Sequence, residues 1–227
     1  MNKERRRDRG RAAILAAAAR AIAREGYHGM SMRDLARATH RGLANAYTYF
    51  ESKEDILFAL QSEAFDALIE GAETATRGDD DPVRKLYAFI LHHLRFFAAH
   101  PDLMRVLVQE AGALPARKRA AIRDRKERYF RVANGILEVL VEFGWGRPGL
   151  PPSPCGATEQ ELERATYALF GMLNWVYGWY EPRRHGSPEA LARTFHRIVL
   201  RGAAPGYEPD ELDAPFPEVA VATGGIS

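Results

Sequence analysis

Hydrophobic residues recur along this chain with helical spacing, and no segment shows sustained strand alternation. Apolar positions three and four residues apart mark about nine segments, at residues 11–24, 32–38, 43–50, 52–76, 83–100, 103–113, 115–143, 158–180 and 190–201. Glycine, proline and acidic residues separate most of them, as in Gly78-Asp79-Asp80-Asp81-Pro82. The pattern predicts an all-α fold.

Two of these segments are short and close together. Ser31 followed by Asp34 is a helix-capping pattern, and Gly42 tolerates the backbone of a turn before the second short helix. Two short helices joined by a few residues fit the helix-turn-helix plan, in which the second helix enters the major groove of DNA. The same pattern also fits a compact helical hairpin that only packs.

The preceding residues complete a three-helix head. Residues 11–24 have high helix propensity, with Ile14, Leu15, Ala18 and Ile22 on the buried side and Gly26 at the end. Residues 2–11 are dense in arginine and form either a solvated, disordered arm or an arm that contacts phosphates or a minor groove. We expect a helix-turn-helix domain at 1–52, a larger helical domain at 53–203 and a loosely ordered tail at 204–227.

Charge is distributed unevenly along the chain. The net charge of the 227 residues is +2, but residues 1–53 carry 12 Lys and Arg against five Asp and Glu, a net of +7, and the remainder carries −5. A basic head suits a protein that presents one end to a polyanion. Cys155 is the only cysteine, no apolar run is long enough to span a membrane, and the N-terminus lacks a signal-peptide pattern, so we expect a cytoplasmic protein.

The head resembles the tetracycline-repressor (TetR/AcrR) family of bacterial transcription regulators. The resemblance runs from AAILAAAARAIAREGYHGMSMRDLA through the pattern Tyr47-x-Tyr49-Phe50-x-x-Lys53-x-x-x-Leu57. It implies a palindromic double-stranded DNA operator and phosphate or base contacts from the second short helix and its surroundings. The DNA-contacting residues implied by the resemblance, with the arginines of the arm, are Arg5, Arg6, Arg7, Ser31, Arg33, Arg41, Leu43, Asn45, Tyr47, Thr48, Tyr49 and Lys53.

The turn of the motif departs from the family pattern. Family members usually carry Gly-Val-Ser followed by Lys or Arg, whereas this chain reads His40-Arg41-Gly42-Leu43. Arg41 can supply the phosphate contact that Leu43 cannot. Phe50 is expected to pack inside the head.

The last two long segments resemble those of TetR-type regulators associated with lipid and acyl-CoA metabolism. In the family these two helices form the four-helix bundle of a homodimer. Two apolar faces are the candidates for that interface, although a helix pair inside a monomer core is the alternative. They consist of Leu162, Leu169, Leu173 and Val176, and of Leu191, Phe195, Ile198 and Val199.

The middle helices are rich in aromatic residues. The resemblance implies an effector site among them, and aromatic side chains with few polar groups suit a small, largely apolar ligand, although each residue can equally be plain core. The candidates are Phe65, Phe89, His93, Phe97, Met104, Tyr129, Phe170 and Asn174. The adjacent His92 and His93 point to different faces of a helix, and the other histidines lack ligand spacing, so neither metal nor cofactor is expected.

Two functions remain in view. The first is a ligand-responsive DNA-binding regulator, a repressor released from its operator by a small apolar effector such as an acyl-CoA thioester or fatty acid. The alternative is an all-α small-molecule carrier or enzyme that does not bind DNA. The chain has no H-E-x-x-H, no glycine-rich phosphate loop and no nucleophile elbow, and a grouping such as Glu110, His93 and Tyr129 has no pattern behind it. We therefore expect no enzymatic activity.

Overall fold

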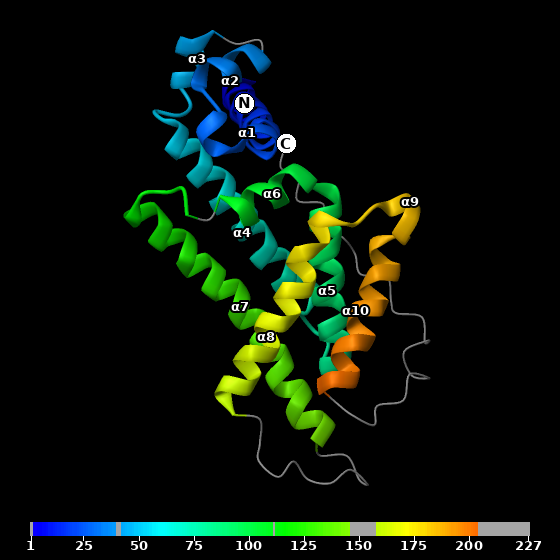
Figure 1. Ribbon diagram of the computed structural model, residues 1–227. Helices are drawn as coiled ribbons and strands as arrows, with labels where there is room; N and C mark the ends of the chain where they lie inside the picture. The colour runs from blue at the N-terminus through cyan, green and yellow to red at the C-terminus, as the bar shows by residue number, and fades with distance from the viewer. Residues whose placement is uncertain (1, 40–41, 111, 146–157, 204–227) are drawn as a thin grey trace. The chain divides into compact units, whose positions relative to one another are not determined.

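The computed structural model describes residues 2–39, 42–110, 112–145 and 158–203 (Figure 1). All regular structure in these residues is helical, as the hydrophobic spacing predicts, and each of the nine expected helices is present. The structure also contains two elements that the sequence did not predict. They are the short helix α9 and the 3-10 turn η1, which lies at the end of the expected segment 158–180. The elements are α1 (Asn2–Gly29), α2 (Met32–Ala38), α3 (Leu43–Tyr47), α4 (Lys53–Ala75), α5 (Pro82–Ala99), α6 (Pro101–Gln109), α7 (Ala116–Trp145), α8 (Glu159–Trp175), η1 (Val176–Gly178), α9 (Pro182–His185) and α10 (Pro188–Ala203).

The described residues form two compact units. Unit 1 contains residues 2–67 and 100–126, and unit 2 contains residues 68–99 and 127–203. The helices α4 and α7 each run through both units without interruption. The head therefore shares its unit with the first part of α4, with α6 and with the first part of α7. The predicted tail at 204–227 lies outside the described residues, as does Cys155.

The helix α1 is longer than expected. It begins at Asn2, so the arginine-rich residues form its first turns, and the expectation of a disordered arm is wrong for them. Arg, Lys and Glu are good helix formers, which accounts for the extension. Gly26 interrupts the helix near its end with φ 75° and ψ 162°, a conformation that is essentially restricted to glycine. The predicted break at Gly26 is thus confirmed.

The core of unit 1 joins α1, α2 and α4. Ile14, Ile22, Leu35 and Ile56 are almost completely buried, and each such side chain contributes roughly 1.5–3 kcal/mol to folding. Phe50 is also buried, as predicted.

The arginine that ends the basic run belongs to this framework. The guanidinium of Arg11 lies 5.3 Å from the centre of the Phe50 ring and also pairs with Glu63. Arg11 therefore fastens α1 to α4.

The helix α5 is the central element of unit 2. It packs against α10 and α8, and most of its residues are buried. The buried His196 on α10 lies with Nε2 2.8 Å from the carbonyl oxygen of Val83, and Arg95 donates to Glu189 at 2.8 Å. These two contacts hold α10 along α5, beside the hydrophobic packing of Phe195 and Leu191.

Candidate functional site

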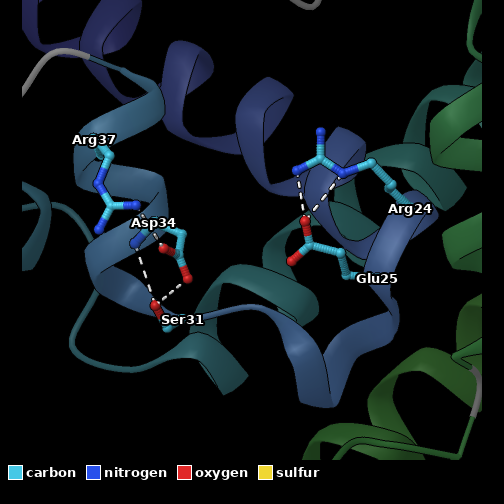
Figure 2. A network of polar contacts seen from close by, with 5 residues as sticks. All are labelled: Arg24, Glu25, Ser31, Asp34 and Arg37. Carbon is cyan, nitrogen blue, oxygen red and sulfur yellow. Dashed lines mark hydrogen bonds and ion pairs between the residues drawn. The ribbon is translucent and has the colours of Figure 1, made fainter.

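The first helix of the predicted DNA-reading motif begins at a well-formed cap (Figure 2). Ser31 has extended backbone angles, and its Oγ accepts the N–H of Asp34 at 3.2 Å. The same hydroxyl donates to the Asp34 carboxylate, which also pairs with Arg37. The serine cap predicted from the sequence is confirmed, while the Asp34 carboxylate bonds the Ser31 hydroxyl, so this hydroxyl has a structural role at the start of α2.

The second helix of the motif, α3, follows after a turn. Thr39 ends α2 by donating its hydroxyl to the carbonyl of Leu35 at 2.8 Å. Ala46 on α3 is completely buried, and this allows α3 to pack closely against α2. Arg41 lies outside the described residues, and so do the side chains of Leu43 and Asn45, although their backbone belongs to α3.

The other predicted DNA-contacting residues differ in exposure. Tyr47 and Thr48 at the end of α3 are exposed, and Tyr49 is half-buried. Arginines of the first turns of α1, and one arginine in α2, are exposed as well. These four arginines are Arg5, Arg6, Arg7 and Arg33. The accessible residues therefore combine phosphate-binding cations with side chains that can reach base edges.

Lys53 takes part in a contact that the sequence did not indicate. Its ammonium lies 4.6 Å from the centre of the Tyr27 ring, and the Tyr27 hydroxyl donates to Glu54 at 2.8 Å. Burial, and then the bond to Glu54, raise the pKa of the Tyr27 hydroxyl, which stays protonated at neutral pH. This packing fixes the start of α4 against the end of α1, which positions Lys53.

Glu110, just beyond α6, connects the same region to the rest of unit 1. Its Oε1 accepts the backbone N–H of Tyr27 at 2.8 Å, directly after the break at Gly26. Its backbone carbonyl accepts the side-chain amide of the buried Gln61 on α4 at 3.1 Å. Glu110 thus joins α1, α4 and α6. Sequence reasoning missed this role because Glu110 lies 83 positions after Tyr27 in the sequence.

Five of the eight effector-site candidates meet in unit 2. They form an aromatic cluster, defined as Phe89, His93 and Phe97 of α5, Tyr129 of α7 and Phe170 of α8. The ring centroids of His93 and Phe97 are 4.1 Å apart, those of Phe89 and Tyr129 5.2 Å, and those of Tyr129 and Phe170 5.5 Å. Four of the five residues are buried, and Phe170 is half-buried. The spacing of four residues along α5 places its three members on one helix face.

The only polar groups of the aromatic cluster bond to each other. His93 Nδ1 lies 3.0 Å from the Tyr129 hydroxyl, and the two rings are stacked at 12°. Burial, and then the nearby His92, lower the pKa of His93, whereas burial raises the pKa of Tyr129. Both groups are therefore uncharged at neutral pH. His93 Nε2 is buried and has no hydrogen-bond partner among the described residues.

The remaining effector candidates lie apart from these contacts. Phe65 and Met104 are buried in unit 1, where the ammonium of Lys126 lies 5.6 Å from the Phe65 ring centre. Asn174 is half-buried on α8. Phe130 was not predicted, but its ring is 6.0 Å from that of Phe170 and 4.8 Å from that of Tyr167. His92 faces away from His93, as expected, with Nε2 3.1 Å from the carbonyl oxygen of Leu68.

Most of the residues predicted to form the dimer interface are buried inside the protomer. Six of the eight are buried within the described chain, whereas Ile198 is 52% exposed and Val199 is half-buried. The large apolar side chains that α8 leaves accessible are different ones, Tyr167 at 61% exposure and Trp175 at 64%. The six buried residues are Leu162, Leu169, Leu173, Val176, Leu191 and Phe195.

Two family descriptions match this chain over the two regions just described. "Bacterial regulatory proteins, tetR family" matches residues 14–60, and "Tetracyclin repressor-like, C-terminal domain" matches residues 79–149 and 156–203. The chain belongs to the TetR family. It is accordingly a DNA-binding transcriptional regulator, with an N-terminal helix-turn-helix and a C-terminal ligand-binding domain.

Individual relatives agree with the TetR assignment. The chain is 28% identical over 190 residues to the fatty acid metabolism regulator protein of Bacillus subtilis, covering 83% of this chain and 93% of the relative. A TetR-family regulator from Bordetella parapertussis has a similar structure, with a TM-score of 0.75, 27% identity and coverage of 84% and 93%. AibR, solved with isovaleryl coenzyme A and operator DNA, has the same fold, with a TM-score of 0.70, 24% identity and coverage of 88% and 100%.

The described residues hold neither a membrane-spanning helix nor a cluster of metal-ligating side chains. No helix there is both long and apolar enough to cross a bilayer. Within the same residues, no three side chains of His, Cys, Asp or Glu gather in a way that could hold a metal ion.

Proposed function

We propose that this TetR-family protein is a dimeric repressor, released from a palindromic operator by a small, largely apolar effector of the acyl-CoA or fatty acid type. The observation that carries the proposal is the aromatic cluster, a group of five rings from three helices, four of them buried, with a single polar pair. Such a lining suits an apolar ligand with one polar feature. The protein acts by binding in the cytoplasm and not by catalysis.

The DNA interface that we propose centres on α3. Asn45 and Thr48 meet base edges, because Asn can pair with adenine and Thr with a base edge or a thymine methyl group. We propose that Leu43 and Tyr47 of the same helix also contact the DNA. Arginine and lysine side chains hold the phosphate backbone and fix the register on the duplex. In this proposal they are Arg5, Arg6, Arg7, Arg33, Arg41 and Lys53. Ser31 and Tyr49 add further contacts to the DNA backbone.

The dimer interface involves α8 and α10. Because most of the apolar face read from the sequence is buried in the protomer, we place the interface on the exposed Tyr167, Trp175 and Ile198. Exposed apolar side chains of this size are typical of protein–protein contacts. Two heads in one dimer bind two half-sites together, which gives a small head sufficient affinity.

Effector binding is communicated along continuous helices. Tyr129 of the aromatic cluster lies on α7, and α7 and α4 both extend from unit 2 into unit 1. A ligand that parts the cluster displaces these helices, and the heads of the dimer then no longer match the operator spacing. This requires that the ligand bind the released state more tightly than the operator-bound state.

The effector class is supported by two proteins. The relative with 28% identity is a regulator of fatty acid metabolism, and AibR, which has the same fold, has been solved with an acyl-CoA and with DNA. A fatty acid or acyl-CoA effector fits the apolar character of the aromatic cluster.

The test begins with the operator. Purified protein is incubated with fragments of its own genome, the retained duplex is sequenced, and its affinity is measured between 50 and 200 mM salt. We expect a palindromic duplex, a steep fall in affinity of about a thousandfold or more for six or more phosphate contacts, and release by acyl-CoA thioesters. Salt-independent or absent duplex binding would favour the carrier alternative, and operator binding that persists with every acyl-CoA would remove the effector class.

A further inference from the structure

The hydrogen-bonding capacity of His93 and Tyr129 is not fully used. Because both groups are uncharged, the pair carries two polar hydrogens, one on the imidazole and one on the phenol. Only one of them lies between His93 Nδ1 and the Tyr129 oxygen, which are 3.0 Å apart. Neither side chain has another hydrogen bond within the described part of the chain.

The surplus donor does not depend on the tautomer. If Tyr129 donates to Nδ1, the hydrogen of His93 is on Nε2, which has no partner within the described residues. If His93 donates from Nδ1, the phenolic hydrogen of Tyr129 has no acceptor there. Either way one donor is left over at a site where the two residues are only 1% and 3% exposed. A buried donor without an acceptor destabilises a protein unless something else accepts the bond.

The surroundings define what that acceptor can be. No lysine or arginine is among the groups that shift the pKa of His93 or Tyr129, and the other members of the aromatic cluster are the rings of Phe89, Phe97 and Phe170. A carboxylate brought into this cluster would be a buried charge without a counter-ion, which is unfavourable. An uncharged carbonyl oxygen accepts a hydrogen bond at a much smaller desolvation cost.

We propose that the His93–Tyr129 pair is the polar anchor for the effector and donates one hydrogen bond to the uncharged carbonyl oxygen of an acyl thioester. This rests on the proposed function and sharpens it, because the repressor then distinguishes the activated thioester from the free fatty acid. The acyl chain lies among the phenyl rings of the cluster. The free acid, with the same chain, lacks an uncharged acceptor at neutral pH.

The experiment compares three ligands on the full-length protein. They are an acyl-CoA chosen from C4 to C16 by its release of the operator, its thioether analogue with CH2 in place of the carbonyl, and the free fatty acid. Affinities are measured by isothermal titration calorimetry. One hydrogen bond makes the thioester bind about fivefold more tightly than the thioether. The free acid binds about tenfold or more weakly than the thioester, because its charge must be buried or neutralised.

Substitutions test whether the preference for the thioester over the thioether comes from His93 and Tyr129. His93→Leu/Tyr129→Phe removes both polar hydrogens with little change in volume, so thioester and thioether should bind equally, while the melting temperature stays the same or rises. A purely structural role would instead lower the melting temperature. Phe97→Leu is the matched control. It loses ring contacts, so both ligands weaken together and the thioester preference remains.

The outcomes separate the two proposals. Equal binding of thioester and thioether to the wild-type protein would overturn the anchor, even if both release the operator and the proposed function stands. The same conclusion follows if the double variant keeps the preference. If that variant does not fold, Tyr129→Phe and the wild-type ratio still decide. Failure of every thioester to release an operator that the protein binds would overturn the anchor together with the proposed effector class.

Discussion

The side chain of Glu110, at the end of α6, accepts the backbone N–H of Tyr27 at 2.8 Å. This bond joins the helix-turn-helix head to α6, which only His100 separates from α5 in the chain. The N–H belongs to the residue after Gly26, whose backbone interrupts α1. Glu110 therefore holds the end of α1 at the point where the chain turns toward α2.

Replacing Glu110 should loosen the head. Glu110→Ala leaves the Tyr27 N–H without its acceptor, and we expect a loss of about 1–2 kcal/mol in the free energy of unfolding, measured by urea denaturation. Glu110→Gln keeps an oxygen at the same place and is the matched control. The effector should also change operator affinity less in Glu110→Ala than in Glu110→Gln. Identical unfolding curves for the two variants would contradict this role.

Gly71 and His92 give a prediction in which two effects oppose each other. A Cβ added to Gly71 would clash with His92 Cε1, so the ring must move and give up its contact with the Leu68 carbonyl. Alanine favours a helix over glycine by about 1 kcal/mol, but the displaced ring and lost hydrogen bond cost about 1–3 kcal/mol. We expect Gly71→Ala to be net destabilising in thermal unfolding.

A second helical glycine supplies the control. A Cβ added to Gly135 on α7 would meet nothing within 4 Å. Gly135→Ala should therefore stabilise the protein by about 0.5–1 kcal/mol through helix propensity alone. The two substitutions are expected to have opposite signs, and a stabilising Gly71→Ala would show that the close approach to His92 is not maintained.

His196 should make the protein sensitive to acid. Burial is the largest effect and lowers the pKa of His196 from 6.5 to about 4, so the folded state favours the neutral ring. The unfolded chain binds this proton at higher pH than the folded protein does. The contribution of His196 to the free energy of unfolding is therefore complete above pH 6.5 and is lost as the pH drops toward 4. The shift corresponds to a loss on the order of 3 kcal/mol.

The measurement is the melting temperature as a function of pH. His196→Gln keeps a donor for the Val83 carbonyl but cannot be protonated, so its melting temperature should fall less between pH 6.5 and 4 than that of the wild type. The melting temperature of the variant will still depend partly on pH, because burial also lowers the pKa of His92 and His93. Parallel curves for the two proteins would mean that His196 does not titrate in this window.

Trp175 tests the dimer interface that we propose. Its side chain is 64% exposed in the protomer, so Trp175→Arg should leave the protomer folded but break an apolar contact between two copies. We expect analytical ultracentrifugation to give the mass of one chain for this variant and of two chains for Trp175→Phe. Operator affinity should fall at least tenfold when the heads are no longer linked. A Trp175→Arg protein that remains dimeric would place the interface elsewhere.

The helices and the local capping could be read from the sequence because they depend on residues three or four apart. The cap between Ser31 and Asp34 and the shared face of Phe89, His93 and Phe97 are of this kind. The pairing of His93 with Tyr129 is different, because it depends on how α5 and α7 cross. Both residues were candidates by type, but their register across two helices is a property of packing.

Periodicity also cannot tell which apolar face is turned inward. The leucines of α8 were predicted to face a partner chain, yet Leu169 and Leu173 are buried in the protomer, and Tyr167 and Trp175 are the exposed residues. Both sets have helical spacing. Only the positions of the neighbouring helices decide between them, and the same holds for Glu110, whose contact with Tyr27 no local pattern indicates.

The most direct test of a ligand-responsive regulator is the reciprocity between its two ligands. Operator affinity is measured with and without saturating acyl-CoA, and acyl-CoA affinity with and without saturating operator, at one salt concentration. We expect each ligand to weaken the binding of the other by the same factor, about tenfold or more, because both act through one conformational equilibrium. Affinities for operator and acyl-CoA that are independent of each other would contradict it.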